Sequence, residues 1–269
     1  MIAVDGKKLA AELLLAVAQE ARDLTPAPKL VVILAEPDEA TEKFVYYKKL
    51  RALEAGIVVE VVDVAACRDT TAVQRVITES LPNCDAVIVQ LPLPVRFDSD
   101  TILKTVPASH DADVLSGQTP VAQILPPVVG AIDLISRAYQ VSFTDKKVVV
   151  IGRGRLVGEP AARYVTSQGG ELTVIDRDSK DKDGDIRAAD IIISGAGVPG
   201  LLQASDLKPG VVVFDAGTSD SQGSLRGDLD AEAAFVTSLF TPVPGGIGPL
   251  TISILLKNVL QLALEHRKK

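Results

Sequence analysis

The chain contains few of the residues that build metal centres and disulfide frameworks. Its 269 residues include only two histidines, His110 and His266, and two cysteines, Cys67 and Cys84. The two cysteines do not have the spacing of a metal site, and so few thiols are typical of a reducing compartment. The composition therefore predicts a cytoplasmic protein without a metal site. It gives little support to histidine-rich metal chemistry or to a Ser-His-Asp hydrolase.

Long apolar runs and an excess of positive charge are also missing. No apolar run reaches the roughly 18 residues that a membrane span requires, and the first eight residues do not resemble a signal peptide. The formal net charge of −7 disfavours nucleic acid or an anionic membrane as the main partner. With 47% hydrophobic and 23% charged residues, the chain is expected to form one large soluble domain or two modest ones.

The order of the predicted elements indicates an α/β fold. Runs rich in apolar residues predict strands at 29–34, 58–64, 86–90, 147–151, 171–175, 190–194 and 211–215, and those at 29–34 and 148–151 are expected to be buried. Helical spacing of apolar residues predicts helices at 7–24, 40–55, 70–80, 100–106, 129–139 and 250–265. Because strands alternate with helices, we expect two domains, each a mostly parallel sheet with flanking helices.

A proline- and glycine-rich stretch from Thr241 to Pro249 precedes the last predicted helix. Such a loop suits a chain that crosses back to the first domain. We therefore expect residues 1–138 and 248–269 to form a catalytic domain and residues 139–247 to form a Rossmann-like domain.

The segment around Gly152 is the strongest local motif. A buried strand at 148–151 leads directly into Gly152-Arg153-Gly154, Gly158 follows, and a helix is predicted after it. Glycines let the backbone approach a phosphate closely, and the N–H groups and dipole of the helix N-terminus hold it. Strand, turn and helix together predict a dinucleotide site, although the spacing is one residue longer than the usual fingerprint.

Charged residues near this turn bear on the choice of dinucleotide. The next predicted strand ends at Asp176-Arg177, where residues that contact the ribose belong. Arg153, Arg155 and Arg177 suit a 2′-phosphate, whereas Asp176 suits a free 2′-hydroxyl. We therefore expect NADP, with NAD possible.

Three further side chains are candidates for chemistry. Lys48 falls in the apolar sector of its predicted helix, where burial can depress a lysine pKa for proton transfer. Gln90 ends a buried strand, at the edge where parallel sheets bind ligands. Asp113 lies in a predicted loop, where its carboxylate could accept paired N–H groups from an amino-heterocycle. Each also has a plain structural reading: a snorkelling lysine, a strand-ending amide and a solvated turn aspartate.

The motifs occur in the order found in bifunctional methylenetetrahydrofolate dehydrogenase/cyclohydrolase, and the chain resembles that family over nearly its whole length. The matching segments are Phe44-Val45-x-x-Lys48, Val89-Gln90-Leu91-Pro92-Leu93-Pro94, Asp111-Ala112-Asp113, Gly152-Arg153-Gly154-x-x-Val157-Gly158-x-Pro160, Asp215-Ala216-Gly217, Gly227-Asp228 and Thr241 to Thr251. One such motif is weak evidence, but the colinear set is specific.

The resemblance implies an enzyme of one-carbon metabolism and purine biosynthesis. It would oxidise methylenetetrahydrofolate with NADP and hydrolyse the methenyl product to 10-formyltetrahydrofolate, as a homodimer. Catalytic roles would fall to Lys48, Gln90 and Asp113. Substrate contacts would come from Phe44, Asp113, Pro244, Gly245 and Gly248. Cofactor contacts are expected from Gly152, Arg153, Gly154, Arg155, Asp176, Arg177, Thr218 and Thr251.

The chain also departs from the family pattern. Phe44 stands where the family has a tyrosine, which removes a hydroxyl, and Val114 replaces the glycine after Asp113. Gly154 replaces a serine. The alternatives are a dehydrogenase with little cyclohydrolase activity, a shikimate-dehydrogenase-like enzyme, and a non-catalytic dinucleotide-binding sensor.

Overall fold

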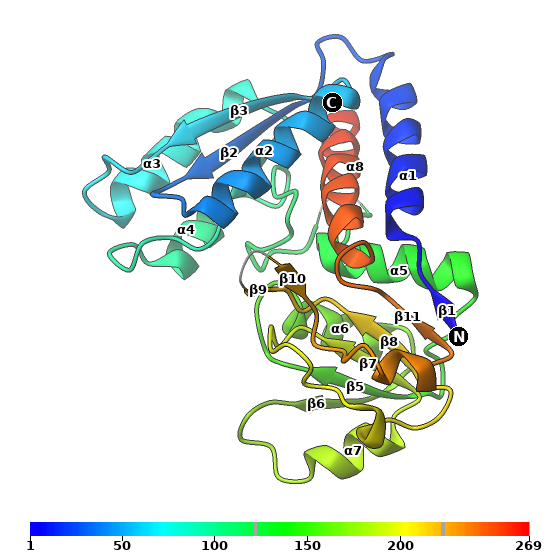
Figure 1. Cartoon of the computed structure of the whole chain (residues 1–269). Coiled ribbons are helices and arrows are strands. Elements are labelled where there is room, and N and C mark those ends of the chain that lie inside the picture. Colours follow the sequence, from blue (N-terminus) through cyan, green and yellow to red (C-terminus); the bar gives the residue numbers. More distant parts are fainter. Residues whose placement is uncertain (121–122, 222–223, 269) are drawn as a thin grey trace. The chain divides into compact units, whose positions relative to one another are not determined.

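The computed structural model describes residues 1–120, 123–221 and 224–268, and the chain divides into two compact units (Figure 1). Unit 1 comprises Met1–Ala10 and Pro127–Thr251, and unit 2 comprises Ala11–Pro126 and Ile252–Lys269. The expected two-domain α/β class with parallel sheets is confirmed. The boundaries differ from the expected ones, since the N-terminal ten residues and helix α5 (Pro127–Tyr139) belong to unit 1.

The N-terminus belongs to unit 1 because its first residues form a strand of that unit's sheet. Strand β1 (Ile2–Ala3) pairs in parallel with β11 (Leu239–Phe240), in the register Ile2↔Leu239. A strand of two residues has no readable side-chain alternation, so the sequence pattern did not predict either one.

Unit 1 contains a six-stranded parallel sheet in the order β1-β11-β8-β7-β5-β6. Its longer strands are β5 (Lys147–Ile151), β6 (Glu171–Ile175), β7 (Ile191–Ser194) and β8 (Val212–Asp215). A short antiparallel hairpin of β9 (Ser219–Ser221) and β10 (Ser224–Arg226) lies outside this sheet.

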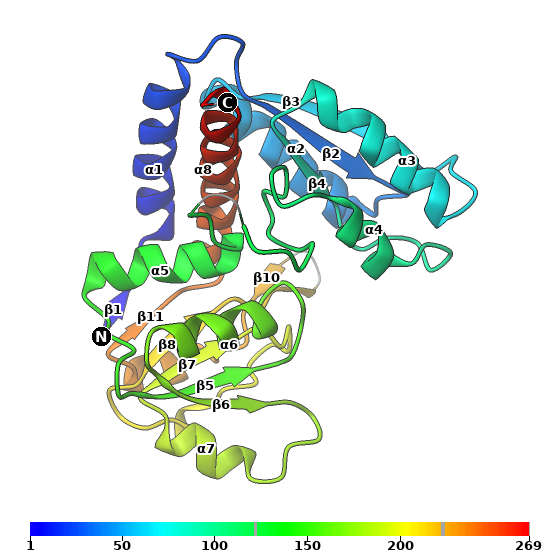
Figure 2. The same ribbon diagram turned by 180° about the vertical axis from the view of Figure 1, so that it is seen from behind.

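Helices cover both faces of the unit 1 sheet. Helix α6 (Gly158–Ser167) packs on β5 and β6 and lies in front of the sheet in Figure 2. Val149 and Ile151 of β5 instead join a buried cluster with Ile186 of α7 (Lys182–Ala188). Because successive side chains of a strand point to opposite faces, α7 lies on the face opposite α6.

Unit 2 is built around a three-stranded parallel sheet in the order β3-β2-β4. The strands are β2 (Lys29–Leu34), β3 (Val58–Asp63) and β4 (Ala86–Val89). One face packs against α1 (Gly6–Ala21), α2 (Glu39–Glu54) and α8 (Ile247–Arg267). The other face packs against α3 (Thr70–Ser80) and α4 (Ser99–Thr105).

Helix α8 corrects the expectation that no segment is long and apolar enough to cross a membrane. In the described part of the chain it is the one helix that meets this test, with a mean hydropathy of 1.5. Its apolar residues, including Leu256, Val259 and Leu260, are buried against α1 and the small sheet, and 61% of the apolar stretch is buried. The core helix of a globular unit passes the same test, because burial on most sides favours apolar residues all round.

Candidate functional site

Helix α2 places Lys48 on the edge of the unit 2 core. The Asp38 side chain caps the helix by accepting a hydrogen bond from the Thr41 backbone N–H at 2.8 Å. Val45 and Ala52 are buried on one stripe, and Lys48 lies between them at helical spacing. The lysine is therefore half-buried, while the neighbouring Lys49 is exposed.

Gln90 fixes the direction of the Lys48 side chain. The Gln90 N–H donates to the Ile33 carbonyl at 2.9 Å, which continues the sheet ladder and sets the residue at the carboxyl end of β4. Its Nε2 donates to the Leu91 carbonyl at 3.0 Å, so its Oε1 faces away and accepts from Lys48 Nζ at 2.7 Å. A neutral amide thus holds the amine without supplying a negative charge.

Asp113 is coupled electrostatically to this lysine. The segment before it runs beside β4, where the Val87 N–H donates to the His110 carbonyl at 2.7 Å. Burial lowers the pKa of Lys48, and the Asp113 carboxylate opposes that shift. Burial raises the pKa of Asp113 to about 6, against the attraction of Lys48 and with a contribution from Asp111. The desolvated amine and carboxyl are the perturbed, mutually dependent groups expected in an active site.

Asp111 has a separate, structural task. It is buried, and its Oδ2 accepts from the Ser116 backbone N–H at 2.7 Å, closing the turn that contains Asp113. Val114 lies in this turn with φ +57°, a left-handed conformation that a β-branched residue rarely adopts. The position therefore stores strain of roughly 1–3 kcal/mol, directly after the candidate carboxylate.

Phe44 precedes Lys48 by one turn of α2. The residue is 48% exposed, so its side chain can meet a planar ligand. It offers a stacking surface without a hydroxyl.

The glycine turn of unit 1 has the backbone geometry of a phosphate cradle. Gly152 has φ +99°, which favours glycine. A Cβ on Gly158 would lie 2.0 Å from the Gly152 carbonyl oxygen, so only glycine lets the start of α6 approach the turn this closely. The N-terminus of α6 therefore opens directly behind the turn, as anion binding requires.

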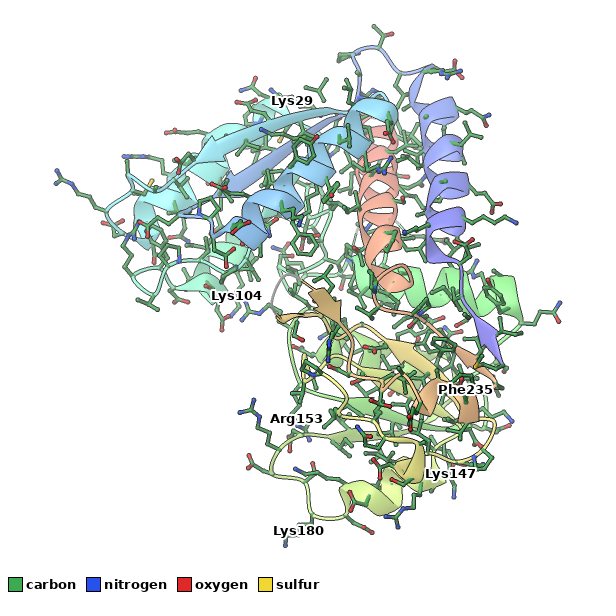
Figure 3. The ribbon with its side chains drawn as sticks, viewed as in Figure 1. Lys29, Lys104, Lys147, Arg153, Lys180 and Phe235 are labelled. Atoms are coloured by element: carbon green, nitrogen blue, oxygen red, sulfur yellow. The ribbon has the colours of Figure 1, made fainter. Side chains whose placement is uncertain are left out.

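Arg153 and Asp176 form an ion pair beside this turn. Arg153 Nε lies 2.6 Å from Asp176 Oδ2, and the Arg153 side chain is 63% exposed. Figure 3 labels this arginine at the surface of unit 1. Asp176 also accepts from Ser179 Oγ and the Asp178 N–H, each at 3.0 Å. These contacts, Arg153 first, lower the pKa of Asp176 to about 2, so the carboxylate is charged at neutral pH.

The remaining predicted residues also lie in unit 1. Pro244 and Gly248 are exposed, and Gly245 has φ +114°. Thr251 Oγ1 donates to the Gly248 carbonyl at 2.8 Å in the first turns of α8. The other cofactor candidates are Gly154 and Thr218, which are exposed, Arg155, which is half-buried in the turn, and Arg177, whose carbonyl accepts from Lys182.

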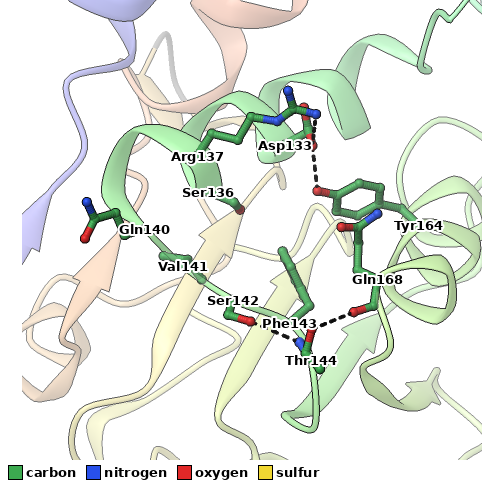
Figure 4. A pocket seen from close by; sticks show the side chains of 10 residues that line it. All are labelled: Asp133, Ser136, Arg137, Gln140, Val141, Ser142, Phe143, Thr144, Tyr164 and Gln168. Atoms are coloured by element: carbon green, nitrogen blue, oxygen red, sulfur yellow. Dashed lines mark hydrogen bonds and ion pairs between the residues drawn. The ribbon is translucent and has the colours of Figure 1, made fainter.

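A separate pocket of about 400 Å³ lies at the amino end of β5, away from the glycine turn at its carboxyl end. Figure 4 shows the residues that line it. Two of its charged groups and one phenol pair with each other: Asp133 accepts from Tyr164 Oη at 3.0 Å and lies 3.0 Å from Arg137 Nε. The buried Ser136 hydroxyl, which also lines the pocket, has no hydrogen-bond partner among the described residues. Burial, with Asp133 beside it, raises the pKa of Tyr164, which keeps this phenol protonated. None of the predicted site residues lines this pocket, and we assign it no ligand.

The α/β fold, the Lys48, Gln90 and Asp113 cluster of unit 2 and the glycine turn of unit 1 define an α/β enzyme of the dinucleotide-binding class. Residues 4–113 match the model of the tetrahydrofolate dehydrogenase/cyclohydrolase catalytic domain, and residues 126–267 match that family's NAD(P)-binding domain. The chain belongs to the tetrahydrofolate dehydrogenase/cyclohydrolase family. This membership confirms the resemblance and removes the shikimate-dehydrogenase-like alternative.

Individual relatives match along nearly their full length. The bifunctional protein FolD of Dechloromonas aromatica is 35% identical over 274 residues, covering 97% of this chain and 96% of the relative. The crystal structure of a FolD methylenetetrahydrofolate dehydrogenase/cyclohydrolase from Campylobacter jejuni has a TM-score of 0.92 at 30% identity, covering 97% of this chain and 98% of that one. The FolD of Trypanosoma brucei, complexed with NADP cofactor and inhibitor, has a TM-score of 0.91 at 29% identity, covering 100% and 99%.

Proposed function

We propose that this protein catalyses the NADP-dependent oxidation of 5,10-methylenetetrahydrofolate and the hydrolysis of the 5,10-methenyl product to 10-formyltetrahydrofolate. The observation that carries the proposal is the 2.7 Å hydrogen bond from Lys48 Nζ to Gln90 Oε1, beside a carboxyl group that interacts with the same amine. Family membership supplies the reaction class, and this constellation supplies the groups that the hydrolytic half requires.

Lys48 moves a proton between the attacking water and the substrate. Its lowered pKa brings the amine closer to the working pH, where acid–base catalysis is most effective. Gln90 orients the amine, and Asp113 accepts N–H groups of the pterin ring. Phe44, Pro244, Gly245 and Gly248 complete the substrate contacts. We assign the folate and its chemistry mainly to unit 2.

The residues of unit 1 fit a dinucleotide. The space between the glycine turn and the N-terminus of α6, which a Cβ on Gly158 would fill, suits the pyrophosphate of the dinucleotide. When bound, NADP accepts a hydride from the methylene carbon. The chain itself positions the dinucleotide through Gly152, Gly154 and Arg155 at the turn, Asp176 and Arg177 at the ribose, and Thr218 and Thr251 beyond them.

Arg153 is expected to favour NADP over NAD. Because arginine binds phosphate bidentately, Arg153→Ala should raise the Kd of NADP about tenfold more than that of NAD. Asp176 is retained in the variant and can still accept a ribose hydroxyl, so NAD binding should persist. Isothermal titration calorimetry with both cofactors measures the ratio. Arg163→Ala, which removes an exposed arginine of α6, is the matched control. Equal losses for the two cofactors would refute this role.

With phenylalanine rather than tyrosine at position 44, we expect hydrolysis of the methenyl product to be slowed more than oxidation of methylenetetrahydrofolate. Oxidation depends mainly on holding two rings in register, which a phenyl surface can do. Hydrolysis also needs an ordered proton route, in which a hydroxyl bonded to a charged group contributes roughly 1.5–3 kcal/mol, or about ten- to a hundredfold in rate. The parent protein should therefore accumulate the methenyl intermediate, and Phe44→Tyr should reduce that accumulation with little change in the dehydrogenase rate. Formation of 10-formyltetrahydrofolate without a lag, with neither rate changed by Phe44→Tyr, would show that the missing hydroxyl has no consequence.

A single absorbance assay tests the proposed function. Purified protein is mixed with methylenetetrahydrofolate and either NADP or NAD, and the methenyl intermediate and the reduced cofactor are followed. Formation and decay of the intermediate support both activities, whereas formation without decay supports the dehydrogenase alternative. Binding of the cofactor without any turnover would identify a sensor instead.

We further propose a cytoplasmic homodimer that binds neither nucleic acid nor membranes. The net charge of −7 and the burial of α8 in a core support this assignment. Sedimentation of the purified protein tests the dimer.

A further inference from the structure

A buried carboxylate outside the predicted site organises the loop that follows β7. Asp228 has no exposed surface, and both its oxygens accept hydrogen bonds from that loop. Oδ2 accepts from Ser194 Oγ at 2.5 Å and from the Ala196 N–H at 2.9 Å, and Oδ1 accepts from the Val198 N–H at 2.7 Å. Gly227-Asp228 is one of the segments that match the family pattern, but the sequence predicts no role for it.

This loop, residues 194–198, packs directly on the glycine turn. Strands β5 and β7 are neighbours with Ile151 opposite Ser194, and the Gly195 N–H donates to the Ile151 carbonyl at 3.1 Å. A Cβ on Gly195 would lie 2.5 Å from Val157 Cγ1, and one on Gly152 would lie 3.3 Å from the Gly195 carbonyl oxygen. The loop therefore forms the wall of the turn at the carboxyl ends of two adjacent strands, where open α/β sheets bind ligands.

The loop depends on Asp228 for its conformation. It contains two glycines, one of them Gly197 with φ +65°, so its backbone has large conformational freedom when it is not held. Asp228 takes up two of its N–H groups and one side-chain hydroxyl. No other described hydrogen bond fixes the Ala196 and Val198 N–H groups.

Asp228 is itself held rigidly from the opposite side. A Cβ on Gly217 would lie 2.2 Å from the Asp228 carboxyl carbon, so the Asp215-Ala216-Gly217 motif packs against this carboxylate. The Leu229 N–H, next in the chain, donates to Asp215 Oδ2 at 2.8 Å. The Asp215-Ala216-Gly217 and Gly227-Asp228 motifs therefore hold each other in place. Because Asp215 is the last residue of β8, this contact fixes Asp228 relative to the sheet.

We propose that Asp228 is a positioning residue for dinucleotide binding: its carboxylate sets the backbone of residues 194–198 against the glycine turn. The proposal rests on the proposed function, which supplies the dinucleotide, and it adds a residue that does not touch the cofactor itself. The carboxylate is needed because three donors converge on two acceptor oxygens. An asparagine would turn an NH₂ group towards an N–H donor and lose at least one of these bonds.

Asp228→Asn in the full chain tests this role. The NADP Kd, measured by titration calorimetry, should rise about ten- to a hundredfold, the effect expected from losing a hydrogen bond to a charged group. Amide hydrogen exchange at Ala196 and Val198 should accelerate. Hydrolysis of methenyltetrahydrofolate, which consumes no dinucleotide, should keep its rate, a result that general unfolding would not produce.

Two variants complete the design. Asp230→Asn changes a carboxylate on the same segment, which accepts from the Glu232 N–H and from no residue of the 194–198 loop among the described hydrogen bonds. This variant should leave the NADP Kd unchanged. Ser194→Ala removes one of the three bonds with less disturbance and should raise the Kd by a smaller factor, so the test stands even if Asp228→Asn does not fold.

Parent-like NADP affinity in Ser194→Ala and in folded Asp228→Asn would overturn the positioning role, as would equal losses of NADP binding and hydrolysis. If the parent protein binds NADP and Asp228→Asn binds it with the same affinity, only the positioning role of Asp228 is refuted. A parent protein that binds neither NADP nor NAD refutes the proposed function and the positioning role with it.

Discussion

Replacement of Lys48 by methionine is expected to lower the rate of methenyltetrahydrofolate hydrolysis by about 10²–10⁴-fold, the usual contribution of a positioned acid or base. Methionine keeps the side chain out to the ε-carbon, with sulfur in place of the δ-methylene, and removes the amine held by Gln90. Burial already penalises the charged amine, as its lowered pKa records, so the fold should not lose stability. Hydrolysis is measured by the decay of methenyl absorbance, and stability by thermal unfolding.

The matched control is Lys49→Met, the next residue of the same helix. Lys49 is exposed, so its loss changes the charge of the protein equally but leaves the Gln90 and Asp113 constellation intact. It should hydrolyse the substrate at the parent rate. If Lys48→Met also does so, Lys48 is not the catalytic lysine and the proton route must be sought elsewhere.

Gly158→Ala is expected to abolish high-affinity NADP binding, with a Kd raised by at least about a hundredfold, or roughly 2.8 kcal/mol. Its Cβ would lie 2.0 Å from the Gly152 oxygen and 2.6 Å from the Gly152 carbonyl carbon, both backbone atoms that cannot rotate away. The start of α6 must therefore move off the turn, and the N–H groups that hold the phosphate move with it. Overpacking of this kind also costs about 1–3 kcal/mol of stability.

Gly154→Ala separates the effect of a clash from the effect of adding a methyl group. A Cβ at Gly154 would have no atom within 4 Å, so the melting temperature of this variant should match that of the parent. Calorimetry with NADP and thermal unfolding provide the two readouts for Gly158→Ala. Parent-like affinity in that variant would show that the turn and the start of α6 do not bind the dinucleotide.

The elements with long buried runs were predicted well from sequence. The strands at 29–34 and 147–151 form with the bounds expected, because four or more consecutive apolar residues suit a strand covered on both faces. The strand at 171–175 also forms with the expected bounds, although it is only partly buried. The short β1 and β11 were missed, since two residues show no period. The N-terminal boundary differs from the expected one for the same reason, because the pairing of β1 with β11 places the first ten residues in unit 1.

The candidate residues were found by type and place, but their relations were not. The position of Lys48 in an apolar sector could be derived from helical spacing. That its amine meets Gln90, 42 residues later, depends on β4 and α2 packing in one unit. The ion pair between Arg153 and Asp176 likewise arises only when two neighbouring strands end side by side.

The sequence by itself determined the α/β class, the glycine turn and the family, because periodicity and motif spacing are local properties of the chain. Only the tertiary structure decided which charges are desolvated and which carboxylates are held. Asp113, Asp176 and Asp228 look alike in the sequence, yet one has a raised pKa, one has a lowered pKa and one is buried among donors. The physical reason is that the state of a carboxyl group depends on the neighbours that folding brings to it, and these come from distant parts of the chain.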